Sequence, residues 1–184
     1  MREGKSKKGV KRDRVEDRIN LTVNGRLYEL ETGEEPGRVE TGHTLAHTLR
    51  ETLGLTGTKV SCDNGACGCC TVLIDGKAML SCMTLTVECD GKHITTIEGL
   101  GDPKTGAFDP LQQSFIDHTA FQCGFCTPGI IMSAKALLNE NPSPTEEEVK
   151  EGLSGNFCRC ISHYHVVKAV MAASAGKKGE RHGR

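Results

Sequence analysis

The chain has 184 residues, of which 36% are hydrophobic, only 4% are aromatic and ten are cysteines. That length accommodates one ordinary domain or two small ones, and small cores usually need a metal or disulfides for stability. The formal net charge of -1, from 23 basic and 24 acidic residues, argues against nucleic acid or an acidic membrane as the main partner.

Residues 1–18 form a basic segment, and we expect a disordered tail there. The segment has neither the hydrophobic region of a secretory signal nor a twin-arginine pair. No run approaches the roughly 18 apolar residues that a membrane-spanning helix requires. We therefore expect a cytoplasmic protein without a membrane span. In a reducing cytosol, ten cysteines indicate metal or redox chemistry more readily than disulfides.

Residues 19–99 are predicted to form a small mixed sheet with one helix. Apolar residues alternate with polar ones from Ile19, and the turn pair Asn24-Gly25 predicts a β-hairpin. Leucines at every fourth position predict a helix that begins near Thr44 and ends at Gly54. Further strands are expected at Thr71–Ile74, on the return from Asp75-Gly76 to Cys82, and at Ile94–Ile97.

Residues 100–110 are rich in glycine and proline, and we place a linker between two domains there. Helical patterns dominate residues 111–175. Thr127 followed by proline predicts an N-cap and a helix that continues to about Leu138.

Two more helices are predicted before the chain ends. Thr145 and Glu148 form a capping-box pattern, which begins a helix after a proline-rich break. A final helix is expected from Ser162 to about Ala173, and residues 176–184 are expected to form a disordered tail.

Four cysteines of the first half follow the spacing Cys62-x4-Cys67-x2-Cys70-x11-Cys82. The opening C-x4-C-x2-C is the spacing of plant-type 2Fe-2S ferredoxins. The glycines between these cysteines let the backbone curl around an anionic cluster and direct N–H groups toward it. The pattern predicts a 2Fe-2S centre, and a zinc site or buried free thiols are the alternatives.

Four cysteines of the second half follow the spacing Cys123-x2-Cys126-x31-Cys158-x-Cys160. Each pair is predicted to lie at the start of a helix, where partial positive charge favours an anionic cluster. The spacing favours a second iron–sulfur centre over zinc. A Rieske arrangement would need two histidines in place of two cysteines, and no histidine occupies a paired position.

These motifs together resemble the small iron–sulfur subunit of the xanthine oxidase family of molybdenum hydroxylases. The resemblance extends over roughly residues 19–172. The matching motifs are Gly57-Thr58-Lys59, Gly65-Ala66-Cys67-Gly68-Cys69-Cys70-Thr71-Val72, Gln122-Cys123-Gly124-Phe125-Cys126-Thr127-Pro128-Gly129 and Gly155-Asn156-Phe157-Cys158-Arg159-Cys160.

The resemblance implies an α+β fold in which a β-grasp, ferredoxin-like 2Fe-2S domain precedes an all-α four-helix-bundle 2Fe-2S domain. It implies an electron-transfer subunit of a molybdenum-dependent hydroxylase or dehydrogenase, with no substrate-reacting site on this chain. Electrons would pass singly from molybdopterin through the helical-domain cluster and the ferredoxin-type cluster to FAD or another acceptor.

The resemblance also implies partners and cofactor contacts. Family members associate with a large molybdopterin-binding subunit, usually together with an FAD-binding subunit, and the expected assembly is a hetero-oligomer. Gln122 and Cys160 match positions that approach the pterin, so they are the expected cofactor-binding residues. The eight cysteines of the two sets are the expected metal ligands.

The chain departs from the family pattern at four places. Ser61 stands where glycine is usual, Ala66 where an acidic or amide residue is common, and Cys69 where alanine is usual. Ile161-Ser162-His163 replaces the usual Thr-Gly-Tyr after the last cysteine. We expect Cys69 to be a small, inert core residue.

Two other functions compete with the electron-transfer subunit. One is a free ferredoxin-like carrier that shuttles between soluble enzymes, and the other is a structural zinc protein. A free carrier does not need the second cysteine set. A structural zinc protein does not account for the two cysteine sets together with Gln122.

Overall fold

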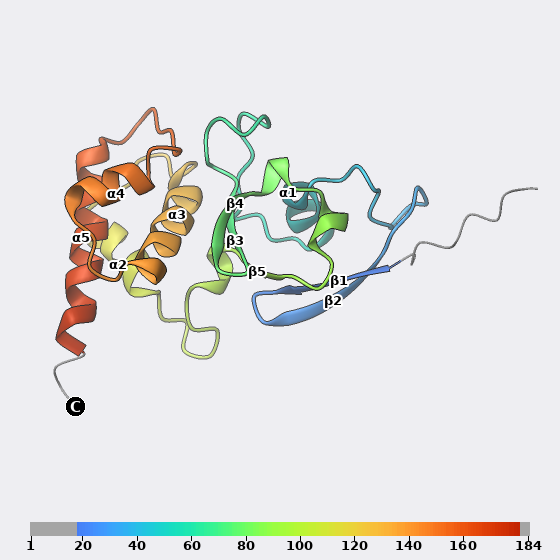
Figure 1. Ribbon diagram of the computed structural model, residues 1–184, viewed down its shortest axis with the longest axis horizontal. Coiled ribbons are helices and arrows are strands. Elements are labelled where there is room, and N and C mark those ends of the chain that lie inside the picture. Colours follow the sequence, from blue (N-terminus) through green and yellow to red (C-terminus); the bar gives the residue numbers. More distant parts are fainter. Residues whose placement is uncertain (1–17, 181–184) are drawn as a thin grey trace, which may run out of the picture.

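The computed structural model describes residues 18–180, which divide into a sheet half and a helical half lying side by side (Figure 1). Helix α5 forms the outer edge of the helical half, at the end of the molecule opposite the β1–β2 hairpin (Figure 1). Residues 1–17 of the predicted N-terminal tail and residues 181–184 of the predicted C-terminal tail lie outside the described residues.

The first half contains a five-stranded mixed sheet with the order β2-β1-β5-β3-β4. Strand β1 pairs in parallel with β5, and the other pairs are antiparallel. Ile19, Leu21 and Val23 are buried while their neighbours face outward, as alternation predicts. The strands are β1 (Arg18–Val23), β2 (Arg26–Glu31), β3 (Thr71–Ile74), β4 (Lys77–Leu80) and β5 (His93–Thr95).

One helical segment packs on this sheet, as the leucine spacing predicts. It begins as α1 (Leu45–His47) and continues as a π-helical turn over Thr48–Thr52, which the sequence did not reveal. The backbone N–H of Leu53 donates to the Thr48 carbonyl, five residues back, at 3.0 Å. Leu45 and Leu49 are fully buried against Leu21, Val72 and Ile94 of the sheet.

Strand β5 ends earlier than the sequence suggests. The prediction extended this strand to Ile97, whereas the chain turns into a 3-10 segment at Ile97–Gly99. The cause is a side-chain bridge from the hairpin turn. The Asn24 Oδ1 accepts from the Thr96 N–H at 2.9 Å, and its Nδ2 donates to the Thr96 Oγ1 at 2.9 Å. Thr96 therefore bonds to a turn instead of to a neighbouring strand.

The second half is a bundle of four helices around one core. Leu111, Phe115, Ile130 and Val170 are almost fully buried there. Thr145 caps its helix with Glu148 as predicted, each side chain bonding the other's backbone N–H. The helices are α2 (Pro110–Asp117), α3 (Thr127–Glu140), α4 (Glu146–Gly152) and α5 (His163–Glu180).

Two predicted helix boundaries were wrong. Cys126, not Thr127, is the N-cap of α3, because its carbonyl accepts the first intrahelical bond, from the Ile130 N–H at 3.1 Å. Helix α5 continues to Glu180, beyond the predicted end at Ala173. A single glycine such as Gly176 costs a helix only about 1 kcal/mol relative to alanine, so it did not end α5.

The two halves meet where α3 crosses β3 (Figure 1). Leu73 of the sheet packs against Met132 and Ala136 of α3 in a shared apolar cluster. At the start of α3, a Cβ atom on Gly129 would lie 2.1 Å from the Gly68 carbonyl oxygen and 2.8 Å from the Cys69 Cα. Only glycine permits so close an approach of the two backbones.

Within residues 18–180, no helix combines the length and the apolar character needed to cross a bilayer.

Replacing Gly129 by alanine should destabilise the chain by about 1–3 kcal/mol, because the added methyl group collides with backbone that cannot rotate away. Urea unfolding followed by circular dichroism measures the difference. Gly42→Ala is the matched control, since a Cβ there meets no atom within 4 Å, and it should change stability by less than about 0.5 kcal/mol. Equal stability of the two variants would contradict the close approach.

Candidate metal centres

The first predicted set of cysteines converges on one side of the sheet half. Cys62 and Cys67 lie in the loop between α1 and β3, Cys70 directly precedes β3, and Cys82 follows β4. The thiols of Cys62 and Cys67 hydrogen-bond each other, as do those of Cys70 and Cys82. Cys70 and Cys82 are 2% and 5% exposed and pack against Ala46.

The backbone of this cysteine loop is shaped to donate hydrogen bonds inward. Asp63, Gly65 and Gly68 have φ angles of 53°, 79° and 71°, a left-handed conformation that bends the loop tightly. The Ala66 N–H donates to the Cys62 Sγ at 3.3 Å. Such donors stabilise negative charge on sulfur.

In the first set, the surroundings of the half-buried Cys62 favour its thiolate form. The N–H of Asn64 and the thiol of Cys67 lower the pKa of Cys62 to about 7. Burial, followed by the Cys70 thiol, raises the pKa of Cys82 to about 11. A buried thiol of this kind becomes a thiolate when a bound metal centre supplies compensating positive charge.

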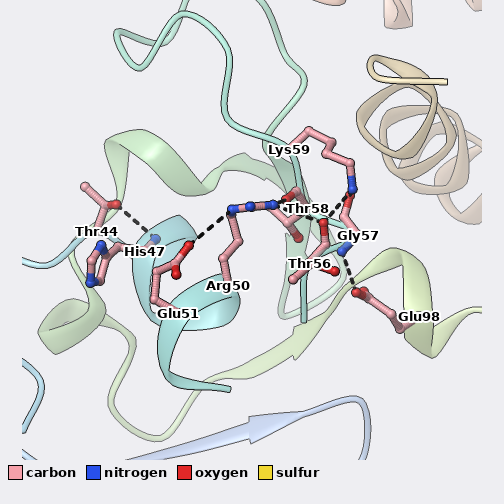
Figure 2. Close-up of polar contacts among 9 residues, drawn as sticks. All are labelled: Thr44, His47, Arg50, Glu51, Thr56, Gly57, Thr58, Lys59 and Glu98. Atoms are coloured by element: carbon pink, nitrogen blue, oxygen red, sulfur yellow. Dashed lines mark hydrogen bonds and ion pairs between the residues drawn. The ribbon is translucent and has the colours of Figure 1, made fainter. Parts of the chain in front are cut away.

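Two cationic side chains, Arg50 and Lys59, hold the segment that leads into this loop by donating to its backbone carbonyls (Figure 2). Arg50 donates to the Thr58 carbonyl at 2.7 Å, and Lys59 donates to the Gly57 carbonyl at 3.2 Å. The Gly57 N–H in turn donates to Glu98 at 2.8 Å. These bonds tie the Gly57–Lys59 motif to the helical turn on one side and to the end of the sheet on the other, immediately before Cys62.

The second predicted set converges at one end of the helical bundle. The Cys160 thiol lies 3.6 Å from the Cys123 Sγ, and both residues are exposed. Cys126 is 8% exposed and hydrogen-bonds the half-buried Cys158. The predicted position at a helix start is confirmed for Cys126, the N-cap of α3, whereas Cys158 and Cys160 lie in the loop before α5.

Backbone donors also serve the second set. The N–H groups of Cys160 and Ile161 donate to the Cys158 Sγ at 3.4 and 3.3 Å. Burial acts to raise the pKa of Cys158, but these two donors and the Cys126 thiol lower it on balance. Burial and Cys158 raise the pKa of Cys126 to about 12. The Cys123 thiol raises the pKa of Cys160.

The thiols are grouped in pairs, which distinguishes the possible metals. All ten cysteines are free thiols. In the part of the chain that the structure describes, no three Cys, His, Asp or Glu side chains are grouped so as to hold a single metal ion. Structural zinc needs four ligands on one ion, whereas a 2Fe-2S centre distributes four thiolates over two irons. The paired arrangement therefore fits 2Fe-2S centres.

The expected pterin-contacting residues share one exposed surface. Gln122 is exposed and directly precedes Cys123, whose sulfur lies against that of Cys160. The family departure Ile161-Ser162-His163 follows at once, and it preserves a backbone donor to the Cys158 sulfur. Gln122 and Cys160 therefore flank the same end of the second set.

Sequence analysis missed a direct link between the two sets. The Phe157 N–H donates to the Cys67 carbonyl at 2.9 Å, and the Asn156 Nδ2 donates to the Gly68 carbonyl at 3.1 Å. Asn156 stands in a motif that matched the family, but no role was assigned to it. The sequence feature that could have indicated this link is the position of the Asn156 amide, two residues before the predicted ligand Cys158.

Comparisons with known proteins agree with this architecture. The family described as "2Fe-2S iron-sulfur cluster binding domain" matches residues 27–108, and the family described as "[2Fe-2S] binding domain" matches residues 96–171. The nicotine 6-hydroxylase small subunit of Paenarthrobacter nicotinovorans is 48% identical over 171 residues, covering 93% of this chain and 96% of that protein. The chain is an iron–sulfur subunit of the xanthine oxidase family of molybdenum hydroxylases.

Two solved structures of similar proteins support the membership of this iron–sulfur subunit. Quinoline 2-oxidoreductase from Pseudomonas putida 86 superposes with a TM-score of 0.80 at 43% identity, covering 89% of this chain and 96% of that chain. Aldehyde oxidoreductase from Desulfovibrio gigas gives a TM-score of 0.79 at 42% identity, covering 89% of this chain but 17% of that chain. In the second protein, the same unit is one part of a longer polypeptide.

The purified iron–sulfur subunit should be brown and contain about four irons and four acid-labile sulfides, as two 2Fe-2S centres require. Elemental analysis with a sulfide assay measures both quantities. Stoichiometric zinc without sulfide would contradict the paired-thiol interpretation.

Cys67→Ser should disturb the paramagnetic signal of one reduced centre and leave the other, because the two sets have different ligands and different N–H donors. Electron paramagnetic resonance of the reduced protein reads both signals. Cys89→Ser is the control, since Cys89 is buried outside both sets and donates to the Leu85 carbonyl, a bond that serine can keep. Loss of both signals from a folded Cys67→Ser protein would show that the ligand sets are divided wrongly.

Proposed function

We propose that this subunit carries electrons singly between a molybdopterin-binding subunit and an FAD-binding subunit or another acceptor. Its ligands for two 2Fe-2S centres are Cys62, Cys67, Cys70 and Cys82 in one set, and Cys123, Cys126, Cys158 and Cys160 in the other. Each centre, when bound, accepts and releases one electron at a time. The observation that carries the proposal is the presence of two four-thiol sets whose loops bond directly to each other.

Two centres in series suit an enzyme whose substrate yields electrons in pairs. Oxidation at molybdenum releases two electrons, and each 2Fe-2S centre holds one. The loops that carry the two thiol sets bond directly to each other, which supports a path by which a pair of electrons leaves the active site singly. A free ferredoxin-like carrier is less favoured, because the relatives match this chain over both halves and are named as subunits.

The partner surface is best placed around the exposed end of the second set. Three phenylalanines within two residues of its cysteines in the sequence are exposed: Phe121 is 36%, Phe125 is 44% and Phe157 is 65% exposed. Exposed aromatic residues are typical of an interface with another protein. We propose that the molybdopterin-binding subunit covers this surface, with Gln122 and Cys160 facing the pterin. The second set then lies nearer the molybdenum, and the first set nearer the acceptor.

The proposed assembly is a hetero-oligomer in the cytoplasm. Ten free thiols suit a reducing compartment better than an oxidising one. The similar aldehyde oxidoreductase, in which the matching unit is 17% of a longer chain, supports a permanent association with larger partners.

Gln122→Ala should slow the reduction of both centres by substrate while iron and sulfide contents stay at the parental level. The reason is that Gln122 is exposed beside Cys123 and contributes to contact with the pterin rather than to the fold. Rapid mixing of the complex with substrate, followed by the bleaching of cluster absorbance, measures the rate.

The control for this measurement is Gln113→Ala. Gln113 is also exposed, and its side-chain amide donates to Asp117 on its own helix. Parental reduction rates in both variants would contradict the assigned contact. An active monomer without molybdenum would contradict the whole proposed assembly.

A further inference from the structure

Three segments meet at the junction of the two halves, and all three adjoin candidate ligands. They are the loop at Cys67–Cys69, the start of α3 at Gly129, and the loop at Gly155–Phe157. The first segment contains Cys67 and ends next to Cys70, the second lies three residues after Cys126, and the third directly precedes Cys158. The junction therefore lies between candidate ligands of the two sets.

Asn156 is the polar side chain at the centre of this junction. It is 4% exposed, and its Nδ2 donates to the Gly68 carbonyl at 3.1 Å across the boundary between the halves. Its own backbone N–H donates to the Leu153 carbonyl at 2.9 Å, which anchors the residue at the end of α4. Asn156 thus joins a fixed point in the bundle to the cysteine loop of the sheet half.

The backbone at Gly68 packs tightly against Gly155 and Asn156. A Cβ on Gly68 would lie 2.5 Å from the Asn156 Nδ2 and 2.6 Å from the Gly155 carbonyl oxygen. Gly68 has a φ of 71°, so its carbonyl direction depends on the left-handed backbone. The next residue of the bundle loop, Phe157, donates its N–H to the Cys67 carbonyl at 2.9 Å.

We propose that Asn156 is a positioning residue that sets the separation of the two centres and so the rate at which an electron passes between them. The inference rests on the proposed function. The transfer moves one electron, oxidises one centre and reduces the other, and neither forms nor breaks a bond. Asn156 acts through the loops that carry Cys67 and Cys158, because its bond to the Gly68 carbonyl lies next to the backbone bond from the Phe157 N–H to the Cys67 carbonyl.

Asn156 can be changed without separating the halves. The apolar contact of Leu73 with Met132 and Ala136 holds the halves together independently of the amide. Removal of the amide should therefore loosen the junction locally and leave each thiol set intact.

The test uses the complete complex with Asn156→Ser, which shortens the side chain, and Asn156→Asp, which keeps its shape but replaces the donor with an acceptor. Asn139→Ser and Asn139→Asp are matched controls on an exposed position of α3. Electron paramagnetic resonance of the fully reduced complex reports the magnetic interaction between the centres. A redox titration gives the potential of each centre. The same spectroscopy on samples frozen rapidly after mixing with substrate follows the arrival of electrons at the first set.

Both Asn156 variants should keep iron and sulfide at parental values, and Asn156→Ser, which adds no charge, should also keep the two potentials. Both should show a weakened magnetic interaction and a several-fold slower arrival of electrons at the first set. The Asn139 variants should match the parent. An unchanged interaction and rate in the Asn156 variants would overturn the inference, as would loss of a centre from both, which would show a structural role. Absence of iron–sulfur centres from the parent would instead refute the proposed function.

Discussion

One constraint underlies the rest of this structure. Burying a negatively charged cysteine thiolate in a protein interior is energetically costly. Cys70, Cys82 and Cys126 are each less than one-tenth exposed, and burial raises the pKa of Cys82 and of Cys126. A thiolate in such a place needs nearby positive charge or hydrogen-bond donors. The fold supplies backbone N–H donors to the neighbouring sulfurs, from Ala66 to Cys62 in one set and from Ile161 to Cys158 in the other. A metal centre held by the buried thiols would supply the positive charge.

The same constraint explains why two small domains share one extensive junction. Each half has its own modest core, built around Leu21 in the sheet and Phe115 in the bundle. A metal centre can stabilise each half from within, as is common for domains of this size. The halves then approach through glycine backbones at Gly68 and Gly129, where side chains would keep them apart. Close approach of backbone makes the relation between the two thiol sets rigid.

The two sets differ in exposure, and the difference matches their proposed places in the electron path. The second set exposes Cys123 and Cys160 beside Gln122, within an apolar rim. The first set has no exposed member, since Cys62 is half-buried and Cys82 is buried. A partner can therefore approach the sulfurs of the second set directly, whereas the first set communicates through the loop that surrounds it.

Local sequence predicted most of the elements of this iron–sulfur subunit and the grouping of its cysteines into two sets. Alternation predicted β1, leucine spacing predicted the helical segment at Leu45, and the capping box of Thr145 predicted α4, because each depends on residues close in sequence. Cysteine spacing predicted the composition of the two thiol sets for the same reason. The start of α3 and the ends of β5 and α5 were predicted less well, since contacts such as Asn24 with Thr96 bring together distant parts of the chain.

Only the tertiary structure decided how the thiols pair within each set and how the sets are joined. The spacing of Cys123 and Cys160 does not reveal that their sulfurs are adjacent, and nothing in the sequence connects Asn156 with Gly68. These contacts join residues 37 and 88 positions apart. They depend on the packing of α3 against the sheet, which local propensity and motif spacing do not encode.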